Sequence, residues 1–109
     1  MSEADTPAVL VRAQWSATAN ATTVRVLMRH AMENGLRRDA AGAPVPAWFI
    51  QEVRATLNGQ EVLRAHWGPS VARHPFLQFS LLAARPGDRV QVAWTDNRGA
   101  TGLGGATVA

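Results

Sequence analysis

The residues of this sequence that are best suited to chemistry lie in one segment, HAMENGLRRDAAGAPVP, which runs from His30 to Pro46. The side chains in it that could hold a metal ion are those of His30, Met32, Glu33 and Asp39. Imidazole and thioether groups suit copper, whereas carboxylates suit harder ions. One histidine beside one methionine makes a poor cage, and the other histidines, His66 and His74, stand far away in the sequence. We therefore expect no metal at this segment.

A carboxylate pair for acid–base catalysis is the second chemistry that the segment offers, through Glu33 and Asp39. Arg37 and Arg38 stand between these two acids in the sequence. Charge-assisted hydrogen bonds from the arginines would instead fix the shape of the segment. We predict an ordered loop with polar latches rather than a catalytic pocket.

Residues 31–47 are also the longest part of the chain without a strand period. Gly35 and Gly42 favour turns. Pro44 and Pro46 stiffen the exit from the loop. A loop of this length in a small domain is usually functional or disordered. Two interpretations stay open: a surface that meets a partner, with an arginine bonding a partner carboxylate, or a purely structural connection that covers the open end of the domain.

Other catalytic groups are sparse. The chain has no cysteine, so it offers no thiolate nucleophile, disulfide, zinc thiolate site or iron–sulfur cluster. The sequence contains no Gly-x-Ser-x-Gly motif. Ser16, Ser70 and Ser80 have no histidine and acid placed nearby in sequence to activate them. We expect a protein that is not an enzyme and that binds no cofactor.

The length and composition are those of one globular domain. The chain has 109 residues, of which 47% are hydrophobic and 17% charged. All 11 basic residues are arginine, so a net charge of only +3 gives an isoelectric point near 11.3. The arginines are scattered and lack interleaved aromatic residues, which argues against nucleic-acid binding. We also expect no membrane helix and no signal peptide, because no long apolar run is present and the first residues lack a basic region.

Apolar residues recur with a period of two along most of the chain, which is typical of β-strands. In one strand Val24, Val26, Met28 and His30 share a face. Asn58-Gly59 is a strong hairpin signal, since both positions tolerate positive φ. We expect strands over residues 8–13, 22–30, 48–57, 60–67, 75–84, 89–95 and 101–109. This pattern predicts an all-β fold, a single immunoglobulin- or fibronectin-III-like antiparallel β-sandwich of about seven strands, after a flexible N-terminus over residues 1–7.

The same period assigns residues to faces. Within residues 48–57 it places Phe49, Val53 and Leu57 on one side, opposite Glu52 and Arg54. Trp94 alternates with valines and is expected in the core. A candidate contact patch is formed by Trp48, Ile50, Leu63 and Trp67.

The glycine-rich tail, GATGLGG, has two interpretations. It could cradle a phosphate, or it could form a hairpin strand with a close backbone approach. No helix and no lysine follow it, which favours the hairpin.

Three blocks of the sequence resemble one known family. They are HAMENGLRRDAAGAPVPAWFI, NGQEVLRAHWGPSVARHPFLQF and VAWTDNRGATG. The residues that carry the resemblance are His30, Met32, Glu33, Gly35, Arg37, Asp39, Gly42, Pro46, Asn58, Gly59, Pro75, Phe79, Trp94, Asp96 and Gly99. From about residue 8 onward the chain is similar to the Z subunit of the SoxYZ sulfur-carrier complex, which belongs to the thiosulfate-oxidising Sox system.

The resemblance implies a SoxZ-like β-sandwich domain over residues 8–109 and a non-catalytic subunit. It implies pairing with the Y subunit, whose cysteine, near a flexible glycine-rich C-terminus, holds the sulfur intermediates. Transient contact with other Sox enzymes is also implied, and the chain could form a homodimer when it is expressed alone. The candidate residues for ordering the loop or meeting a partner are then His30, Met32, Glu33, Gly35, Arg37, Arg38, Asp39 and Pro46.

Localisation follows from the resemblance as well. The sequence by itself suggests the cytoplasm, whereas members of the family act in the periplasm and are exported bound to the Y subunit. Two alternatives remain. One is a small metal-binding redox protein of similar fold, which would need a bound ion or a second histidine near His30. The other is a generic immunoglobulin-like interaction domain.

Overall fold

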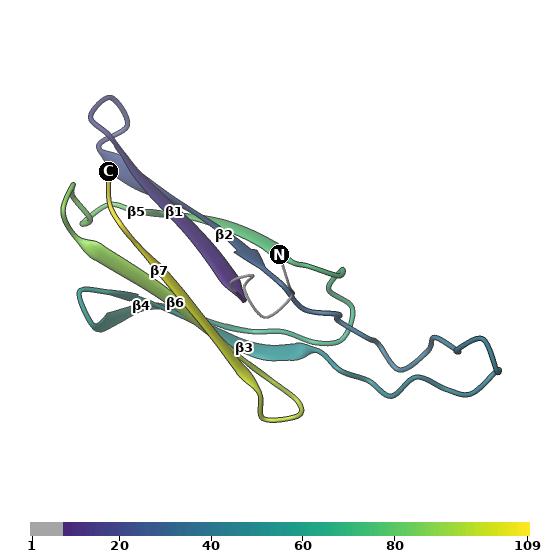
Figure 1. The fold of residues 1–109 in the computed structure, drawn as a ribbon. Helices are drawn as coiled ribbons and strands as arrows, with labels where there is room; N and C mark the ends of the chain where they lie inside the picture. Colours follow the sequence, from purple (N-terminus) through teal and green to yellow (C-terminus); the bar gives the residue numbers. More distant parts are fainter. Residues whose placement is uncertain (1–7) are drawn as a thin grey trace, which may run out of the picture.

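A computed structural model describes residues 8–109, and the regular secondary structure in this range is all β. Within it seven strands form two antiparallel sheets that face each other (Figure 1). The predicted β-sandwich and its number of strands are confirmed. The flexible N-terminus expected over residues 1–7 lies outside the described residues. No helix in residues 8–109 is long and apolar enough to cross a membrane.

The two sheets have three and four strands. The first has the order β1-β2-β5, formed by Val9–Ser16, Ala21–Met28 and Phe76–Leu81. The second has the order β4-β3-β6-β7, formed by Gln60–His66, Ile50–Leu57, Arg89–Asp96 and Thr101–Thr107. The chain crosses between the sheets after β2, β4 and β5, as in sandwiches with Greek-key connections.

The core consists of the inward-facing residues of both sheets, as the period of two predicts. The largest fully buried apolar side chains are those of Met28, Ile50, Val24, Val26, Val53, Val90 and Val92. Trp94 is only 6% exposed, so its expected place in the core is confirmed.

The start of β3 departs from the alternation in the sequence. A β-bulge between Ile50 and Glu52 shifts the pairing of β3 with β6. Because a bulge inserts an extra residue, it reverses which side chains face inward. Ile50, which is fully buried, therefore takes the inward position beside Val53 that the alternation assigned to Phe49. Phe49 instead borders an open pocket.

The predicted contact patch around this bulge is wrong. Ile50 is fully buried, Leu63 and Trp67 are partly buried against the core, and Trp48 is also partly buried. The bulge is again the reason, because it turns the most apolar member of the set inward.

The glycines of β7 allow a close approach of other groups. A Cβ on Gly102 would overlap the indole of Trp94, and one on Gly104 would overlap the backbone of Val9 at the start of β1. Ala109 continues this contact, since its C=O and N–H bond the backbone of β1 at 2.9 and 3.0 Å. The tail is a hairpin strand with a close backbone approach, as expected.

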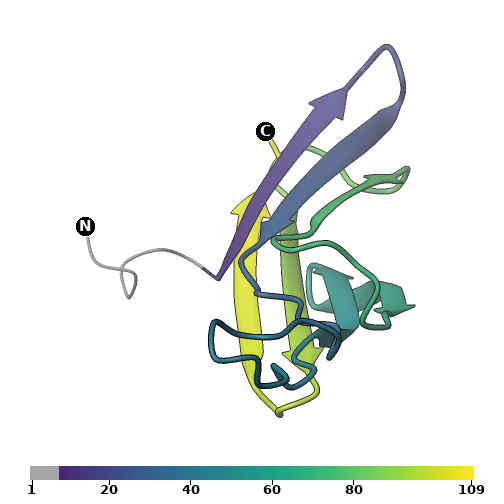
Figure 2. The ribbon, with the colours of Figure 1, turned by 90° about the vertical axis from the view of Figure 1, so that its right-hand side faces the viewer.

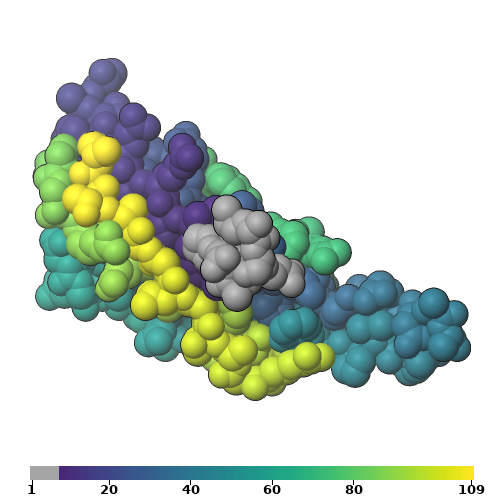
Figure 3. Space-filling model, viewed as in Figure 1, coloured from purple at the N-terminus to yellow at the C-terminus, as the bar shows by residue number. Residues whose placement is uncertain are grey.

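A long projection separates β2 from β3. We call residues 31–49 the arm. The arm leaves one end of the sandwich and stands clear of it (Figures 1 and 3). Figure 2 looks at the molecule from the side toward which the arm points.

Candidate functional site

The two halves of the arm are bonded to each other. Glu33 N–H donates to Trp48 O at 2.6 Å, and Trp48 N–H donates to Glu33 O at 2.8 Å. Further out, Val45 N–H donates to Arg37 O at 2.8 Å. At a rise of about 3.3 Å per residue, the stretch from Glu33 to Asp39 would reach at most about 20 Å if it were fully extended. The arm is thus an irregular β-ribbon rather than an unpaired loop.

Asp39 shapes the tip of the arm. Its Oδ1 accepts the N–H groups of Ala41 and Ala43, each at 2.9 Å. Gly42 completes the turn with a φ of 81°, which favours glycine. Asp39 forms no ion pair within residues 8–109, so the expected bond to an arginine is wrong. Asp39 Oδ1 instead accepts hydrogen bonds from the backbone of the tip.

The predicted latch between Glu33 and Arg37 is confirmed. Arg37 donates from Nη2 and Nε to Glu33 Oε1 at 2.7 and 3.0 Å. This hydrogen bonding to the guanidinium lowers the pKa of Glu33 below its ordinary value. Arg38 donates to the carbonyl of Gly42 at 2.9 Å. Because these groups are exposed, the bonds define the shape of the arm more than they stabilise the fold.

The outer part of the arm is blunt and exposed. Gly35 has a φ of 85°. Pro44 and Pro46 have no N–H to offer a neighbouring strand. Leu36 is 84% exposed. An edge that lacks these N–H donors resists pairing with strands of other molecules. Its exposed side chains remain free to contact a partner.

His30 closes the base of the arm and is only 5% exposed. Its Nε2 lies 3.0 Å from Asp96 Oδ2, and its Nδ1 accepts the N–H of Met32 at 3.0 Å. An acceptor nitrogen carries no proton, so the bonding pattern assigns a neutral ring with its hydrogen on Nε2. His30 therefore holds the arm and the sheet together, since one ring nitrogen bonds Asp96 and the other bonds the backbone of Met32.

Asp96 is the hub of this base. Its Oδ2 accepts from His30 and from Trp48 Nε1, at 3.0 and 2.8 Å. Its Oδ1 accepts the N–H groups of Arg98 and Ala100, each at 2.9 Å. Burial would raise the pKa of the carboxyl, but these hydrogen bonds more than offset it and lower the pKa below its ordinary value. The carboxylate stays ionised although Asp96 is only 2% exposed.

The turn after β6 also grips the returning half of the arm. Asn97 Oδ1 accepts the N–H of Phe49, and its Nδ2 donates to the carbonyl of Ala47, both at 2.9 Å. The guanidinium of Arg98 lies 4.3 Å from the ring centroid of Trp48, a cation–π contact. We call His30, Trp48, Asp96 and Asn97 the arm-base latch.

Met32 and a second histidine bear on the metal alternative. His74 Nδ1 accepts the backbone N–H of His30 at 3.1 Å, so a second histidine does lie near His30. However, both ring nitrogens of His30 are already bonded, and Met32 Sδ accepts the N–H of Ile50 at 3.3 Å. In residues 8–109 no group of three histidine or acidic side chains is arranged around one point. The geometry favours structural roles for these residues.

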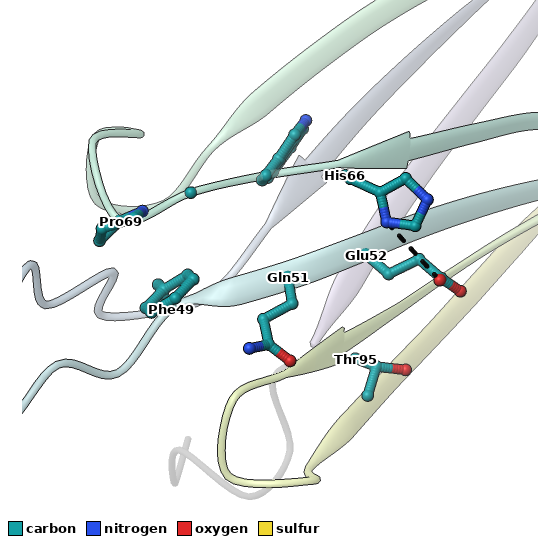
Figure 4. Close-up of a pocket in the computed structure, with 8 residues that line it drawn as sticks. Phe49, Gln51, Glu52, His66, Pro69 and Thr95 are labelled. Atoms are coloured by element: carbon teal, nitrogen blue, oxygen red, sulfur yellow. Dashed lines mark ion pairs between the residues drawn. The ribbon is translucent and has the colours of Figure 1, made fainter.

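A separate hollow of about 570 Å³ lies at the ends of β3, β4 and β6. Figure 4 shows the residues that line it, Phe49, Gln51, Glu52, His66, Trp67, Gly68, Pro69 and Thr95. His66 Nδ1 is 3.9 Å from Glu52 Oε2. Glu52 also pairs with Arg54 and Arg64 at 3.3 and 3.6 Å. The single acid of this open pocket is therefore shared among three cationic or potentially cationic neighbours.

Sequence reasoning missed the latch partners. The strand expected over residues 89–95 ends before Asp96, and Trp48 is expected in a contact patch. The available signal was the alternation of Val90, Val92 and Trp94, which continues to Asp96 and points it inward. A buried acid must be hydrogen-bonded, so that register predicts donors around Asp96.

The fold and the site together define a class, a two-sheet β-sandwich that extends an ordered arm from a buried polar latch. Residues 11–106 of the chain match the family model described as Sulphur oxidation protein SoxZ. The chain belongs to the SoxZ family and is a subunit of the Sox sulfur-oxidation system. No curated protein matches the chain.

Proposed function

We propose that this chain is the non-catalytic subunit that pairs with a cysteine-bearing Y-type sulfur-carrier subunit during thiosulfate oxidation. The observation that carries the proposal is the SoxZ match over residues 11–106. The chain has no cysteine, so it has no thiol on which a persulfide or thiosulfonate could form. Its contribution to the carrier is then to bind and present the subunit that has one.

The arm supports this role by its shape. It projects from the sandwich (Figure 1), and the bond between His30 and Asp96 holds its base in one orientation. Its outer residues, including Leu36 and Arg37, are exposed. Because the arm is already ordered before it binds, less conformational entropy is lost on binding. We propose that the arm extends the surface that meets the Y subunit, with transient contacts to other Sox enzymes on the resulting complex.

The periplasm is the proposed location, with export of the chain bound to the Y subunit. Co-expression and fractionation test both ideas. We expect the chain to co-purify with a tagged Y-type subunit and to reach the periplasm only when that subunit is present. A chain that reaches the periplasm alone would refute co-export. Failure to co-purify under any condition would refute the pairing.

Asp39→Ala tests the arm, since it removes the acceptor of two backbone N–H groups at the tip. We expect weaker binding to the Y subunit with little change in melting temperature, because the tip lies outside the core. Glu61→Ala is the matched control. Glu61 is an exposed acid on β4 of the four-stranded sheet, where it pairs with Arg64 at 2.8 Å. Equal binding by both variants would remove the arm from the interface.

A further inference from the structure

The outer face of the first sheet carries a row of exposed apolar residues. The registers place Leu10 opposite Leu27, and Leu27 opposite Phe76, one residue from each of β1, β2 and β5. Directly opposite residues of an antiparallel sheet project from the same face. Leu10, Leu27 and Phe76 are 46%, 38% and 60% exposed. Together they form one apolar row across the whole sheet.

Arginines border this row on both sides. Arg12 and Arg25 lie directly opposite each other on β1 and β2, two residues along from the apolar row. Arg29 lies on the opposite side of the row, two residues after Leu27. Its N–H donates to the carbonyl of Ala8, the residue before β1, at 2.9 Å. Alternation puts all three on the same face as Leu27. The apolar row is thus framed by positive charge.

No carboxylate on these strands neutralises that charge. The sequences of β1, β2 and β5 contain no Asp or Glu. Within residues 8–109 the three arginines form no ion pair, and Arg25 bonds only the amide of Gln78, at 3.2 Å. Like charges directly opposite each other, as in Arg12 and Arg25, are unfavourable. A partner carboxylate would relieve this repulsion.

The second sheet shows the contrast. On its outer face Arg54 pairs with Glu52 at 3.3 Å, and Arg64 pairs with Glu61 at 2.8 Å and with Glu52 at 3.6 Å. Arg54 and Arg64 are thus neutralised within the chain, whereas Arg89, at the start of β6, forms no ion pair within residues 8–109. The outer face of the first sheet therefore carries three arginines without an ion pair, Arg12, Arg25 and Arg29, and that of the second sheet carries one, Arg89.

We propose that the outer face of the first sheet docks the Y-type subunit through a surface with an apolar centre and a rim of carboxylates. The proposal rests on the proposed function for the identity of that partner. Charge complementarity selects an acidic surface and disfavours a second copy of this chain, whose arginines would face their like. The face also adjoins the arm, since Leu27 lies three residues before His30 in the chain. Sheet face and arm would form one continuous contact.

The test is the affinity for the purified Y-type subunit of the same genome, measured by calorimetry. We expect Phe76→Asp and the double variant Arg12→Glu/Arg25→Glu to weaken binding by about tenfold or more. The wild-type affinity should fall with added salt more steeply than that of the double variant. The controls are Leu103→Asp, at a residue 63% exposed on β7, and Arg54→Glu, both expected to bind within about twofold of wild type.

Three outcomes overturn the proposal, and they are distinguishable. Wild-type binding that all four variants retain refutes this face while the proposed function stands. Weaker binding by the second-sheet controls Leu103→Asp and Arg54→Glu alone would place the interface on the second sheet. No binding by the wild type refutes the proposed function and this inference together. Oxidative footprinting of the wild-type complex avoids any question of variant folding: Leu10, Leu27 and Phe76 should be protected, and their unchanged reactivity would refute the docking face.

Discussion

Replacing Asp96 by asparagine changes one atom at the hub of the arm-base latch. The carboxylate accepts from two side chains on Oδ2 and from two backbone N–H groups on Oδ1. An amide keeps one oxygen and turns an NH₂ group toward the other pair of donors. If that pair is His30 and Trp48, the Nε2–H of His30 faces the NH₂ group without an acceptor. His30 cannot relieve this by moving its hydrogen to Nδ1, because Nδ1 already accepts the N–H of Met32. In either orientation two of the four donors lose their acceptor, either the His30 and Trp48 side chains or the partly buried N–H groups of Arg98 and Ala100.

The magnitude follows from that count. A buried donor left without a partner costs about 1–3 kcal/mol; because His30 is neutral, the substitution leaves no unpaired charge that would add to this cost. Two such donors make us expect Asp96→Asn to lower the free energy of unfolding by about 2–5 kcal/mol, a large part of the roughly 5–15 kcal/mol that stabilises a typical domain. Urea unfolding followed by tryptophan fluorescence and circular dichroism measures the difference.

The control is Asp88→Asn. Asp88 accepts from Arg85 N–H and Asn58 Nδ2 at 2.8 and 3.1 Å, but water reaches its turn and can replace the lost bonds. A loss for Asp96→Asn no larger than that of this control, or below about 1 kcal/mol, would show that the arm-base latch does not stabilise the fold.

Acid titration checks the same reasoning independently. Folding lowers the pKa of Asp96 from its ordinary value of 3.8, so its contribution is fully present above that value and is lost as the pH falls through the folded pKa. The difference between wild type and Asp96→Asn should therefore shrink as the pH falls below about 4. Other acids whose pKa is lowered, such as Glu33, titrate in both proteins and cancel. A difference that stays constant to low pH would contradict the assignment.

The remaining predictions concern packing and the state of the histidine. Gly102→Ala should lower the free energy of unfolding by about 1–3 kcal/mol, because its methyl group would overlap the Trp94 indole. The control is Gly68→Ala, whose methyl group would meet no atom within 4 Å and should leave the free energy of unfolding unchanged. Equal effects of the two substitutions would show that Gly102 is not required for packing against Trp94. Long-range ¹H–¹⁵N spectra should show the hydrogen of His30 on Nε2 and none on Nδ1 at neutral pH; the opposite tautomer would contradict the latch. Zinc or copper should leave the melting temperature unchanged, and a stoichiometric stabilisation would restore the metal alternative.

The strands were predictable because their information is local. Alternation and turn signals such as Asn58-Gly59 located each strand to within a few residues, and both residues of that turn have the expected positive φ, 50° and 85°. The bulge at Ile50 was not predictable, because it depends on how β3 pairs with β6 and leaves no mark in the alternation.

The site was predictable only in its near-neighbour contacts. Glu33 and Arg37 are four residues apart, and their ion pair followed from their types and spacing. His30 and Asp96 are 66 residues apart, and only the packing of the two sheets brings them together. The exposed row of Leu10, Leu27 and Phe76 likewise depends on strand order, which no single segment of the sequence encodes.

The central claim is that this chain serves as the partner of a thiol-bearing carrier subunit. Native mass spectrometry of the chain co-expressed with the Y-type subunit of its own genome tests it most directly. We expect an intact heteromer whose sulfur adducts, after exposure to the other Sox components, reside on the Y subunit alone. A chain that stays apart from the Y subunit and binds copper or zinc stoichiometrically would contradict the account.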